Sequence, residues 1–312
     1  MKRIAFMFPG QGSQTVGMGK DLYDVYPQVQ ALYREANEVL EMDLQTLMFE
    51  GPEETLTETE NTQPALLLSS VAVTQLLEEN GIRPSMVVGH SLGEYSALVA
   101  AGAMNWQDAI GLVKVRGHLM EQAFPEGQGT MAAVLGLDQD KVQEALDQVT
   151  DEIVDMANLN SPGQIVISGS VAGIEQATAF LKEAGAKRVL PLNVSGPFHS
   201  RLMKQANEDF AAYLNEVALE NPETPVYANV SAEAVTEKET VKELLVQQLH
   251  SPVRFEESIE KMLEEGVDAF VEVGTGKVLC GLLKKIDRKA KTFAVQDQES
   301  LEAFIRWYKE EE

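Results

Sequence analysis

The sequence predicts an α/β protein: a hydrolase-like parallel sheet flanked by helices, with an inserted ferredoxin-like α+β subdomain. Short apolar runs alternate with helical patterns, which is typical of parallel strands buried by helices on both faces. A Gly-x-Ser-x-Gly motif follows one of these runs directly. A central stretch with a different order of predicted strands and helices interrupts the alternation and predicts a second, smaller unit.

The large unit is expected to contain five buried parallel strands. Each is a short apolar run bounded by turn-forming or polar residues, and helical patterns separate one run from the next. The five predicted strands are Ile4–Phe8, Met86–Val88, Val226–Asn229, Ala269–Val273 and Thr292–Val295.

The interrupting stretch has the order β-α-β-β-α-β, the split βαβ arrangement of ferredoxin-like domains. We therefore predict a catalytic domain of residues 1–126 and 195–312 and a subdomain of residues 127–194, with the site in the cleft between them. The predicted subdomain elements are Thr130–Leu137, Gln139–Val149, Ile153–Asn158, Gln164–Ser168, Ala172–Ala184 and Arg188–Val194.

Composition excludes several classes of protein. The 312 residues include 49 acidic and 25 basic residues, a net charge of −24, so nucleic acid is not expected as a partner. No apolar stretch is long enough to cross a membrane, and the chain begins with a strand rather than a signal peptide. One cysteine, Cys280, excludes an internal disulfide and fits the cytoplasm. No cluster has metal-ligand spacing, so no metal site is expected.

The Gly89-x-Ser91-x-Gly93 motif predicts a nucleophilic serine. A strand ends, the chain turns sharply, and a helix begins, which leaves Ser91 exposed near the positive N-terminal end of that helix. The glycines are required because a side chain at either position would collide with the neighbouring strand or helix. An ordinary glycine-rich turn is the alternative, but the small residues of the following helix favour the nucleophile.

A serine nucleophile needs a base, and histidine is the usual one. His199 lies where the subdomain rejoins the large domain, whereas His250 suits the chain order of α/β-hydrolases. The residue patterns leave these two candidates open. His90 directly precedes the nucleophile, so its side chain should diverge and provide packing or support, and His118 lies within a helix.

Arg116 places a permanent cation in the apolar stripe of a predicted helix. A buried guanidinium needs an anionic partner. That partner is either an internal Asp or Glu, or a substrate carboxylate held in a bidentate fork. The sequence pattern does not decide between the two.

The segment after the first predicted strand is rich in glycine and contains Gly10-x-Gly12. Thr15 stands where the third glycine of a dinucleotide-binding fingerprint belongs, which excludes that function. Such a turn can still offer a backbone N–H to an oxyanion, and Leu92, the residue after the nucleophile, supplies a second donor.

Basic residues gather near the end of the chain despite the acidic composition: Lys284, Lys285, Arg288, Lys289 and Lys291. They form either a solvated helix end or a local positive dock for an acidic partner.

Seven motifs occur in one order along the chain, and together they resemble those of the malonyl-CoA:acyl-carrier-protein transacylase family of bacterial fatty acid synthesis. Each motif is short, but seven in register are specific. They are Phe8-Pro9-Gly10-Gln11-Gly12-Ser13-Gln14, Thr62-Gln63-Pro64-Ala65, Gly89-His90-Ser91-Leu92-Gly93-Glu94, Val113-x-x-Arg116-Gly117, Asn160-Ser161-Pro162-Gly163-Gln164, Gly196-Pro197-Phe198-His199-Ser200 and Gln248-x-x-Ser251-Pro252-Val253.

The resemblance implies a role for each catalytic residue. Ser91 would be the acylated nucleophile and His199 its base, oriented by the main-chain carbonyl of Gln248 rather than by a carboxylate. The backbone N–H groups of Gln11 and Leu92 would form the oxyanion hole.

The resemblance also implies how substrates bind. Arg116 would hold the malonyl carboxylate, and Phe198 would fill the space that a 2-methyl group needs. His90, Gln63 and Asn160 would line the site or the thioester channel. The acidic carrier protein favours a carrier-protein dock, which we define as Lys284, Lys285 and Arg288 with Lys187 and Arg188.

The implied reaction is a ping-pong transfer of malonyl from malonyl-CoA, through an ester on Ser91, to the phosphopantetheine thiol of acyl carrier protein. No cofactor is expected, since the CoA thioester is a substrate and CoA a product, and the protein is expected to be a cytoplasmic monomer.

Three rival functions are weighed against this transfer. A trans-acting polyketide synthase acyltransferase has nearly the same motifs. A serine thioesterase or esterase would use His250 as its base, but Arg116 would be idle for a neutral ester. An inactive scaffold that only binds carrier protein is disfavoured by the intact Ser91, His199 and Arg116.

Overall fold

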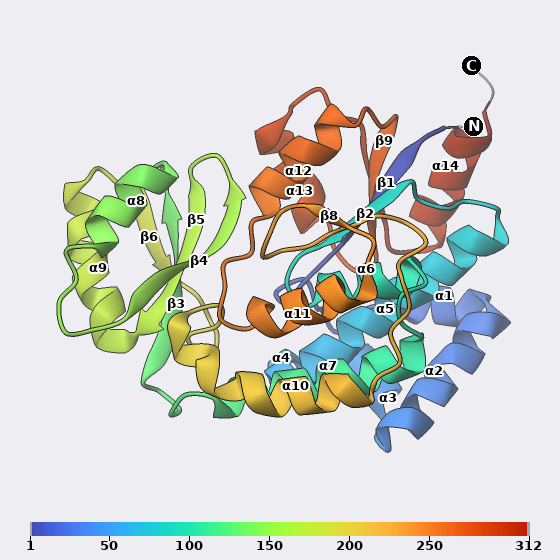
Figure 1. The fold of residues 1–312 in the computed structure, drawn as a ribbon. Coiled ribbons are helices and arrows are strands. Elements are labelled where there is room, and N and C mark those ends of the chain that lie inside the picture. Colours follow the sequence, from blue (N-terminus) through green and yellow to red (C-terminus); the bar gives the residue numbers. More distant parts are fainter. Residues whose placement is uncertain (1, 311–312) are drawn as a thin grey trace.

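The large domain is built on a six-stranded sheet with the strand order β10-β9-β1-β2-β7-β8 (Figure 1). The computed structural model describes residues 2–310. All five predicted strands are confirmed and run parallel: β1 (Ile4–Phe8), β2 (Met86–Gly89), β7 (Val226–Tyr227), β9 (Ala269–Val273) and β10 (Thr292–Val295). The sequence analysis missed β8 (Ala234–Val235), a two-residue strand that pairs antiparallel with β7.

Helices cover both faces of this sheet, and β1 shows why a continuous apolar run forms its centre. Ile4, Phe6 and Phe8 belong to one buried cluster, while Ala5 and Met7 belong to another on the opposite face. Because successive strand residues face opposite sides, both must be apolar when both faces are covered.

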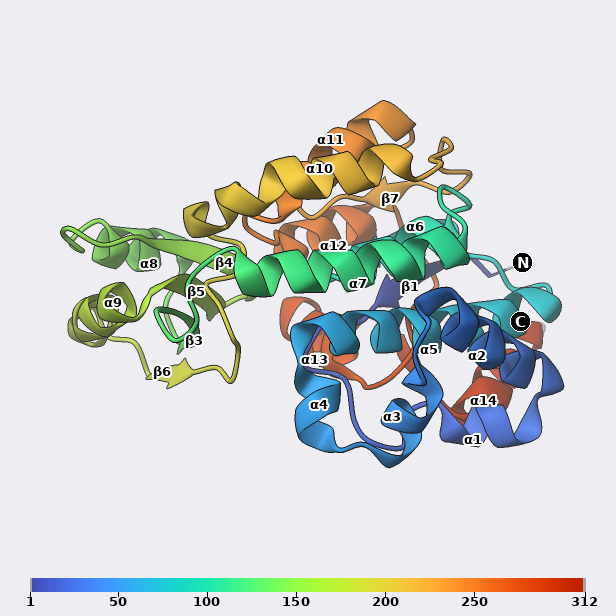
Figure 2. The same cartoon turned by 90° about the horizontal axis from the view of Figure 1, so that it is seen from below.

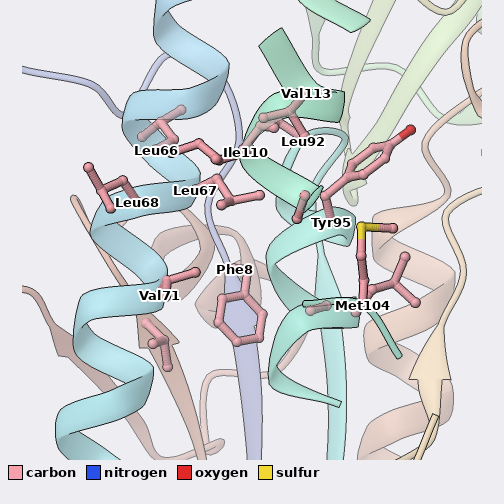
Figure 3. Close-up of a cluster of buried hydrophobic side chains, with 14 of the residues drawn as sticks. Phe8, Leu66, Leu67, Leu68, Val71, Leu92, Tyr95, Met104, Ile110 and Val113 are labelled. Atoms are coloured by element: carbon pink, nitrogen blue, oxygen red, sulfur yellow. The ribbon is translucent and has the colours of Figure 1, made fainter. Parts of the chain in front are cut away.

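The first face packs against α5 (Thr59–Glu79), α6 (Gly93–Ala100) and α7 (Trp106–Gln122), and the second against α12 (Phe255–Glu264) and α13 (Val278–Ile286). Figure 3 shows Phe8 of β1 in the first of these clusters, together with Leu67 of α5 and Tyr95 of α6.

A second sheet of four strands has the order β4-β5-β3-β6, and its paired strands are antiparallel. With its two helices the chain order is β-α-β-β-α-β, so the predicted fold class, including the inserted α+β unit, is confirmed. The exact domain limits stay a prediction. The elements are β3 (Gly129–Leu135), α8 (Gln139–Leu146), β4 (Val154–Ser161), β5 (Gln164–Ser170), α9 (Val171–Glu183) and β6 (Arg188–Pro191).

Main-chain hydrogen bonds join the small sheet to the large domain. The N–H of Leu159 in β4 donates to the carbonyl of Val253 (2.9 Å), and the N–H of Val253 donates to the carbonyl of Ala157 (2.8 Å). Helix α7 crosses the molecule and ends beside the small sheet (Figure 2). These contacts place the carboxyl end of β4 next to the turn that follows β2.

The remaining helices complete the large domain: α1 (Lys20–Val25), α2 (Pro27–Leu40), α3 (Leu44–Glu50), α4 (Glu53–Thr57), a 3-10 turn (Arg201–Ala206), α10 (Asn207–Glu216), α11 (Lys238–Gln248) and α14 (Gln298–Lys309). Within residues 2–310, every helix is too short or too polar to cross a membrane. The two ends of the chain meet, because Lys2 Nζ lies 3.5 Å from the carbonyl oxygen of Tyr308 (Figure 1).

Candidate active site

Ser91 sits in the sharp turn between β2 and α6. Its φ is 51°, in the left-handed region that side chains other than glycine rarely occupy. A Cβ on Gly89 would lie 1.9 Å from the carbonyl carbon of Gly93, and a Cβ on Gly93 would lie 2.0 Å from the carbonyl oxygen of Phe8. Both glycines are therefore required by close backbone approach, as the motif predicts.

His199 is the base that the fold brings to Ser91. The Ser91 hydroxyl donates to His199 Nε2 at 2.8 Å, while Nδ1–H donates to the carbonyl oxygen of Gln248 at 2.8 Å. Since a carbonyl only accepts, Nδ1 carries the ring proton and Nε2 is free to take the serine proton. His199 also has a positive φ, 59°, so both members of the pair have left-handed backbone conformations.

The surroundings of His199 keep the ring neutral. Its side chain is 3% exposed. Burial, and next the charge of Arg116, lower the pKa of His199 from 6.5 to about 3. A neutral imidazole at physiological pH is the state that a general base needs.

Two backbone N–H groups are available near Ser91. Within the described residues, nothing accepts a hydrogen bond from the N–H of Gln11 or of Leu92. A Cβ on Gly10 would lie 2.3 Å from the carbonyl oxygen of His90, so the turn after β1 packs directly on the nucleophile turn. Two unpaired donors from adjoining turns are the arrangement that an oxyanion hole requires.

Arg116 points at the nucleophile from α7, with its side chain 1% exposed. Nη2 donates to Ser91 Oγ (3.1 Å) and to Oε1 of Gln248 (2.8 Å), and Nη1 donates to Oε1 of Gln63 (2.9 Å). Nε has no partner among the described residues. Over the same part of the chain no carboxylate oxygen lies within 4.0 Å of the guanidinium, so Arg116 forms no internal ion pair there.

His90 and Asn160 connect the two sheets beside Ser91. His90 Nε2 donates to Oδ1 of Asn160 in β4 at 2.7 Å, and the imidazole lies against the ring of Phe255 with 5.6 Å between centroids. Phe198, the residue before the base, is buried in the core cluster of the large domain. The side chain of His90 diverges from that of Ser91 and supports the turn.

The other two histidines lie away from Ser91. His250 Nδ1 accepts from Nδ2 of Asn207 at 2.8 Å, and His118 Nδ1 lies 3.1 Å from a carboxylate oxygen of Glu60 at the surface. Neither contacts Ser91, which resolves the sequence-based choice in favour of His199.

Two site residues escaped prediction by residue pattern. Oδ1 of Asn229, just beyond β7, accepts from the N–H of Ser91 at 2.8 Å, and its Nδ2 donates to the carbonyl oxygen of Gly89 at 2.6 Å. Glu94, in the first turn of α6, is buried and accepts from the N–H of Asn229 and from Nε2 of Gln248. The available signals were a polar residue at the carboxyl end of a buried strand and a carboxylate in an apolar helix.

The predicted carrier-protein dock is only partly assembled. Lys187 and Lys285 line one cavity of about 1010 Å³, and Lys285 Nζ donates to Oε1 of Gln164 at 2.7 Å. Lys284 Nζ instead donates to the carbonyl oxygen of Ala290, and Arg188 and Arg288 are exposed outside this cavity. The same cavity is also lined by carboxylates: Asp138, Glu256, Glu257 and Glu260.

The link between this cavity and the nucleophile turn runs through strand β4. Asn160 contacts His90, while the next residues of the chain, from Ser161 to Gln164, line the cavity.

Among residues 2–310, no group of three or more His, Cys, Asp or Glu side chains is placed to hold a metal ion.

Comparisons with known proteins agree with this geometry. The profile of the acyl transferase domain family matches residues 5–305. A malonyl CoA-acyl carrier protein transacylase of Bacillus subtilis (strain 168) is 54% identical over 313 residues, covering 100% of this chain and 99% of the relative. The crystal structure of an acyl carrier protein S-malonyltransferase from Vibrio cholerae has a TM-score of 0.95 at 46% identity and covers 97% of this chain and 99% of that one. The structure of a malonyl-transacylase in complex with a type II polyketide synthase acyl-carrier protein has a TM-score of 0.95 at 44% identity, with the same coverage.

Proposed function

Because this chain belongs to the acyl transferase family, and within it to the malonyl CoA-acyl carrier protein transacylases, we propose that Ser91 carries a malonyl group from malonyl-CoA to acyl carrier protein. The enzyme is an acyltransferase of fatty acid synthesis. One observation carries the assignment of the acyl group: the buried guanidinium of Arg116 lies 3.1 Å from the Ser91 hydroxyl and has no carboxylate partner among residues 2–310.

In the first half-reaction, His199 Nε2 takes the proton of Ser91 Oγ as that oxygen attacks the thioester carbonyl carbon. The N–H groups of Gln11 and Leu92 stabilise the tetrahedral oxyanion, each contributing about 2.7–4 kcal/mol by comparison with other oxyanion holes. The C–S bond then breaks, the CoA sulfur takes the proton from His199, and malonyl remains as an ester on Ser91.

In the second half-reaction, the phosphopantetheine thiol of the carrier protein gives its proton to His199 and attacks the ester carbonyl. A second tetrahedral intermediate occupies the same oxyanion site. The C–O bond to Ser91 breaks, Ser91 Oγ recovers the proton, and malonyl leaves as a thioester of the carrier protein.

Arg116 selects the acyl group. Its donors now bond to neutral oxygens of Gln63, Gln248 and Ser91, and a malonyl carboxylate is a stronger acceptor than any of them. The guanidinium can therefore turn to the substrate carboxylate when malonyl-CoA enters. We propose that Phe198, the residue before the base, restricts room at the 2-position of the acyl chain.

The carrier protein is proposed to bind over the cavity that contains Lys187 and Lys285. Positive side chains at this edge offset the repulsion between two acidic proteins. Glu256, Glu257 and Glu260, which line the same cavity, would orient the acidic partner toward the lysines, since like charges repel.

The direct test is intact-mass analysis after mixing the protein with malonyl-CoA and, separately, with acetyl-CoA. We expect a malonyl adduct on the wild-type protein, little acetyl adduct, and no adduct on Ser91→Ala. A Ser91→Ala protein that still acquires malonyl would refute the assignment. Rapid appearance of free malonate without carrier protein would favour a hydrolase instead.

Further properties of the enzyme are proposals. We propose that it needs no cofactor, acts in the cytoplasm and is monomeric, which light scattering at micromolar concentration would test. A polyketide pathway is the alternative destination for the malonyl group, since a similar structure contains a polyketide carrier protein. Comparing transfer to fatty acid and polyketide carrier proteins would separate the two.

A further inference from the structure

Glu94 is a buried carboxylate that forms no ion pair with any described residue. Its side chain is 3% exposed, and among the described residues no Lys, Arg or His nitrogen lies within 4.0 Å of its oxygens. Oε2 accepts from the N–H of Asn229 at 3.2 Å and from Nε2 of Gln248 at 2.6 Å. Burying a carboxylate is costly, so this placement requires a physical reason.

The amide of Gln248 lies between Glu94 and Arg116. Its Oε1 accepts from Arg116 at 2.8 Å, and its Nε2 donates to Glu94 at 2.6 Å. Because a guanidinium only donates and a carboxylate accepts, this amide can have only one orientation. Two buried opposite charges are thus joined through one neutral side chain.

Gln248 also contacts both members of the catalytic pair. Its backbone carbonyl accepts from His199 Nδ1 at 2.8 Å, and its Nε2 lies 3.1 Å from the backbone oxygen of Ser91. The residue ends helix α11, so its side-chain bonds hold that helix terminus against the nucleophile turn. Whatever fixes the Gln248 side chain therefore fixes base, nucleophile and guanidinium together.

We propose that Glu94 is a positioning residue for acyl transfer, which holds Gln248 so that its amide carbonyl faces Arg116 and its backbone carbonyl faces His199. This inference rests on the proposed function, because it concerns transfer through the same serine. It adds a specificity role to Glu94, a residue that does not touch the substrate.

The neutral side chain of Gln248, which lies between Glu94 and Arg116, explains how Arg116 stays available to substrate. A carboxylate in direct contact would occupy the donors that a malonyl carboxylate needs. With Gln248 between them, Arg116 has no charged acceptor among the described residues, and only neutral oxygens of Gln63, Gln248 and Ser91 have to be displaced.

The hydrogen bond from Gln248 to Glu94 does not depend on the charge of Glu94. Burial raises the pKa of Glu94 to about 7, against the opposing effects of its hydrogen bonds and of Arg116. Charged or neutral, the carboxyl group keeps an oxygen that accepts from Gln248. A glutamine at position 94 can therefore supply the same contact.

The test compares Glu94→Ala and Glu94→Gln. Each rate is divided by the concentration of protein molecules whose Ser91 can be acylated by malonyl-CoA or acetyl-CoA, so that misfolded protein does not count. We expect Glu94→Ala to lower kcat about 10- to 100-fold, by analogy with the loss of a hydrogen bond that orients a metal ligand. It should also lower the malonyl-to-acetyl ratio of kcat/KM by about tenfold or more, since Gln248 no longer holds the guanidinium of Arg116 beside Ser91. Glu94→Gln should restore both to within a few-fold of wild type.

Glu272→Ala is the matched control. Glu272 is a second buried glutamate, in β9, whose carboxylate accepts from the N–H groups of Leu279 (3.1 Å) and Cys280 (2.9 Å) at the start of α13. Its loss should lower the melting temperature and leave the malonyl-to-acetyl ratio unchanged. If Glu94→Ala does not fold, Glu94→Met is tested in its place, because methionine fills the space without offering a strong hydrogen-bond acceptor.

Two results would overturn the proposal: wild-type kcat and ratio in Glu94→Ala or Glu94→Met, or a Glu94→Gln protein as impaired as these. Both comparisons presuppose a malonyl adduct on the wild-type serine. Absence of that adduct would instead contradict the proposed function itself, so the two failures are distinguishable.

Discussion

The Ser91 hydroxyl has two neighbours with different tasks. His199 Nε2, at 2.8 Å, accepts its proton, and Arg116 Nη2, at 3.1 Å, donates to the same oxygen. A positive charge at that distance favours the alkoxide and disfavours protonation of the imidazole. The same guanidinium thus tunes reactivity before substrate arrives and recognises the substrate carboxylate afterwards.

The pH dependence of Ser91 reactivity follows from the lowered pKa of His199. The neutral form is the active base, so activity is lost only as pH falls through the folded-state pKa, about 3, rather than through 6.5. Inactivation by a sulfonyl fluoride should therefore keep its rate from pH 8 down to at least pH 5. A rate that halves near pH 6.5 would contradict this.

Replacing Arg116 by Gln should raise the pKa of His199, because the charge that disfavours the imidazolium is gone. The acid limb of the inactivation profile should move toward 6.5. Sulfonyl fluoride lacks a carboxylate, so impaired malonyl binding does not affect this measurement. An unshifted limb would mean that burial alone sets the pKa.

Arg116→Ala should lose the preference for malonyl. Removing one partner of a buried, hydrogen-bonded charge pair costs at least about 2 kcal/mol, or roughly thirtyfold in the malonyl-to-acetyl ratio of kcat/KM. Lys114→Ala, on the same helix but partly exposed, is the matched control. Retained selectivity in Arg116→Ala would remove this residue from substrate recognition.

At the scale of elements, the nucleophile turn shows where sequence reasoning is strong. Gly-x-Ser-x-Gly predicted a strand, a turn and a helix because the requirement is local: there is no room for a Cβ at Gly89 or Gly93. The five apolar strands were predictable for a similar reason, since burial on both faces demands continuous apolar runs. Strand β8 was not predictable, because an edge strand of two residues is too short to show a hydrophobic pattern in the sequence.

Contacts between distant segments were beyond the residue pattern. Asn229 and Glu94 are polar residues whose partners lie 138 and 154 positions away, at Ser91 and Gln248. His199 could not be separated from His250 until the fold placed only one of them against Ser91. The family resemblance implied His199, but the physical reason is a contact that exists only in the folded structure.

The close packing of the turn predicts a difference between two glycines. A Cβ at Gly93 would lie 2.0 Å from the carbonyl oxygen of Phe8, whereas a Cβ at Gly111 in α7 would meet nothing within 4 Å. Gly93→Ala should destabilise the protein by roughly 1–3 kcal/mol through backbone displacement and abolish acylation. Gly111→Ala should instead stabilise it by about 0.5–1 kcal/mol, as in other helix interiors. Urea unfolding measures both, and equal effects would contradict the packing argument.

At the scale of the whole molecule, the carrier-protein dock depends on both domains. Lys187 comes from the small subdomain and Lys285 from α13 of the large one, yet they line the same cavity. Any partner that spans this cavity contacts both units. The sequence analysis grouped five basic residues as one dock, and two of them, Lys187 and Lys285, line this cavity.

Reversing these charges should weaken carrier-protein use alone. In Lys187→Glu/Lys285→Glu, KM for carrier protein should rise about tenfold or more at low salt, with a smaller change at high salt because of screening. Acylation by malonyl-CoA alone should be largely retained. Lys20→Glu, on α1 at the opposite end of the large domain, is the control (Figure 1). An unchanged KM would place the partner elsewhere.

The position of β1 in the middle of the large sheet has a consequence for how the protein is made. Ile4 pairs with Ala269 of β9 on one side and the strand's next residues pair with β2 on the other. A ribosome must therefore synthesise most of the chain before the first strand can acquire its second neighbour, whereas all strands of the small sheet are complete by residue 191. Gln248, which orients the base, also emerges late. The small sheet thus has all its strands before the large sheet does, and we expect no consumption of malonyl-CoA before Gln248 has been synthesised.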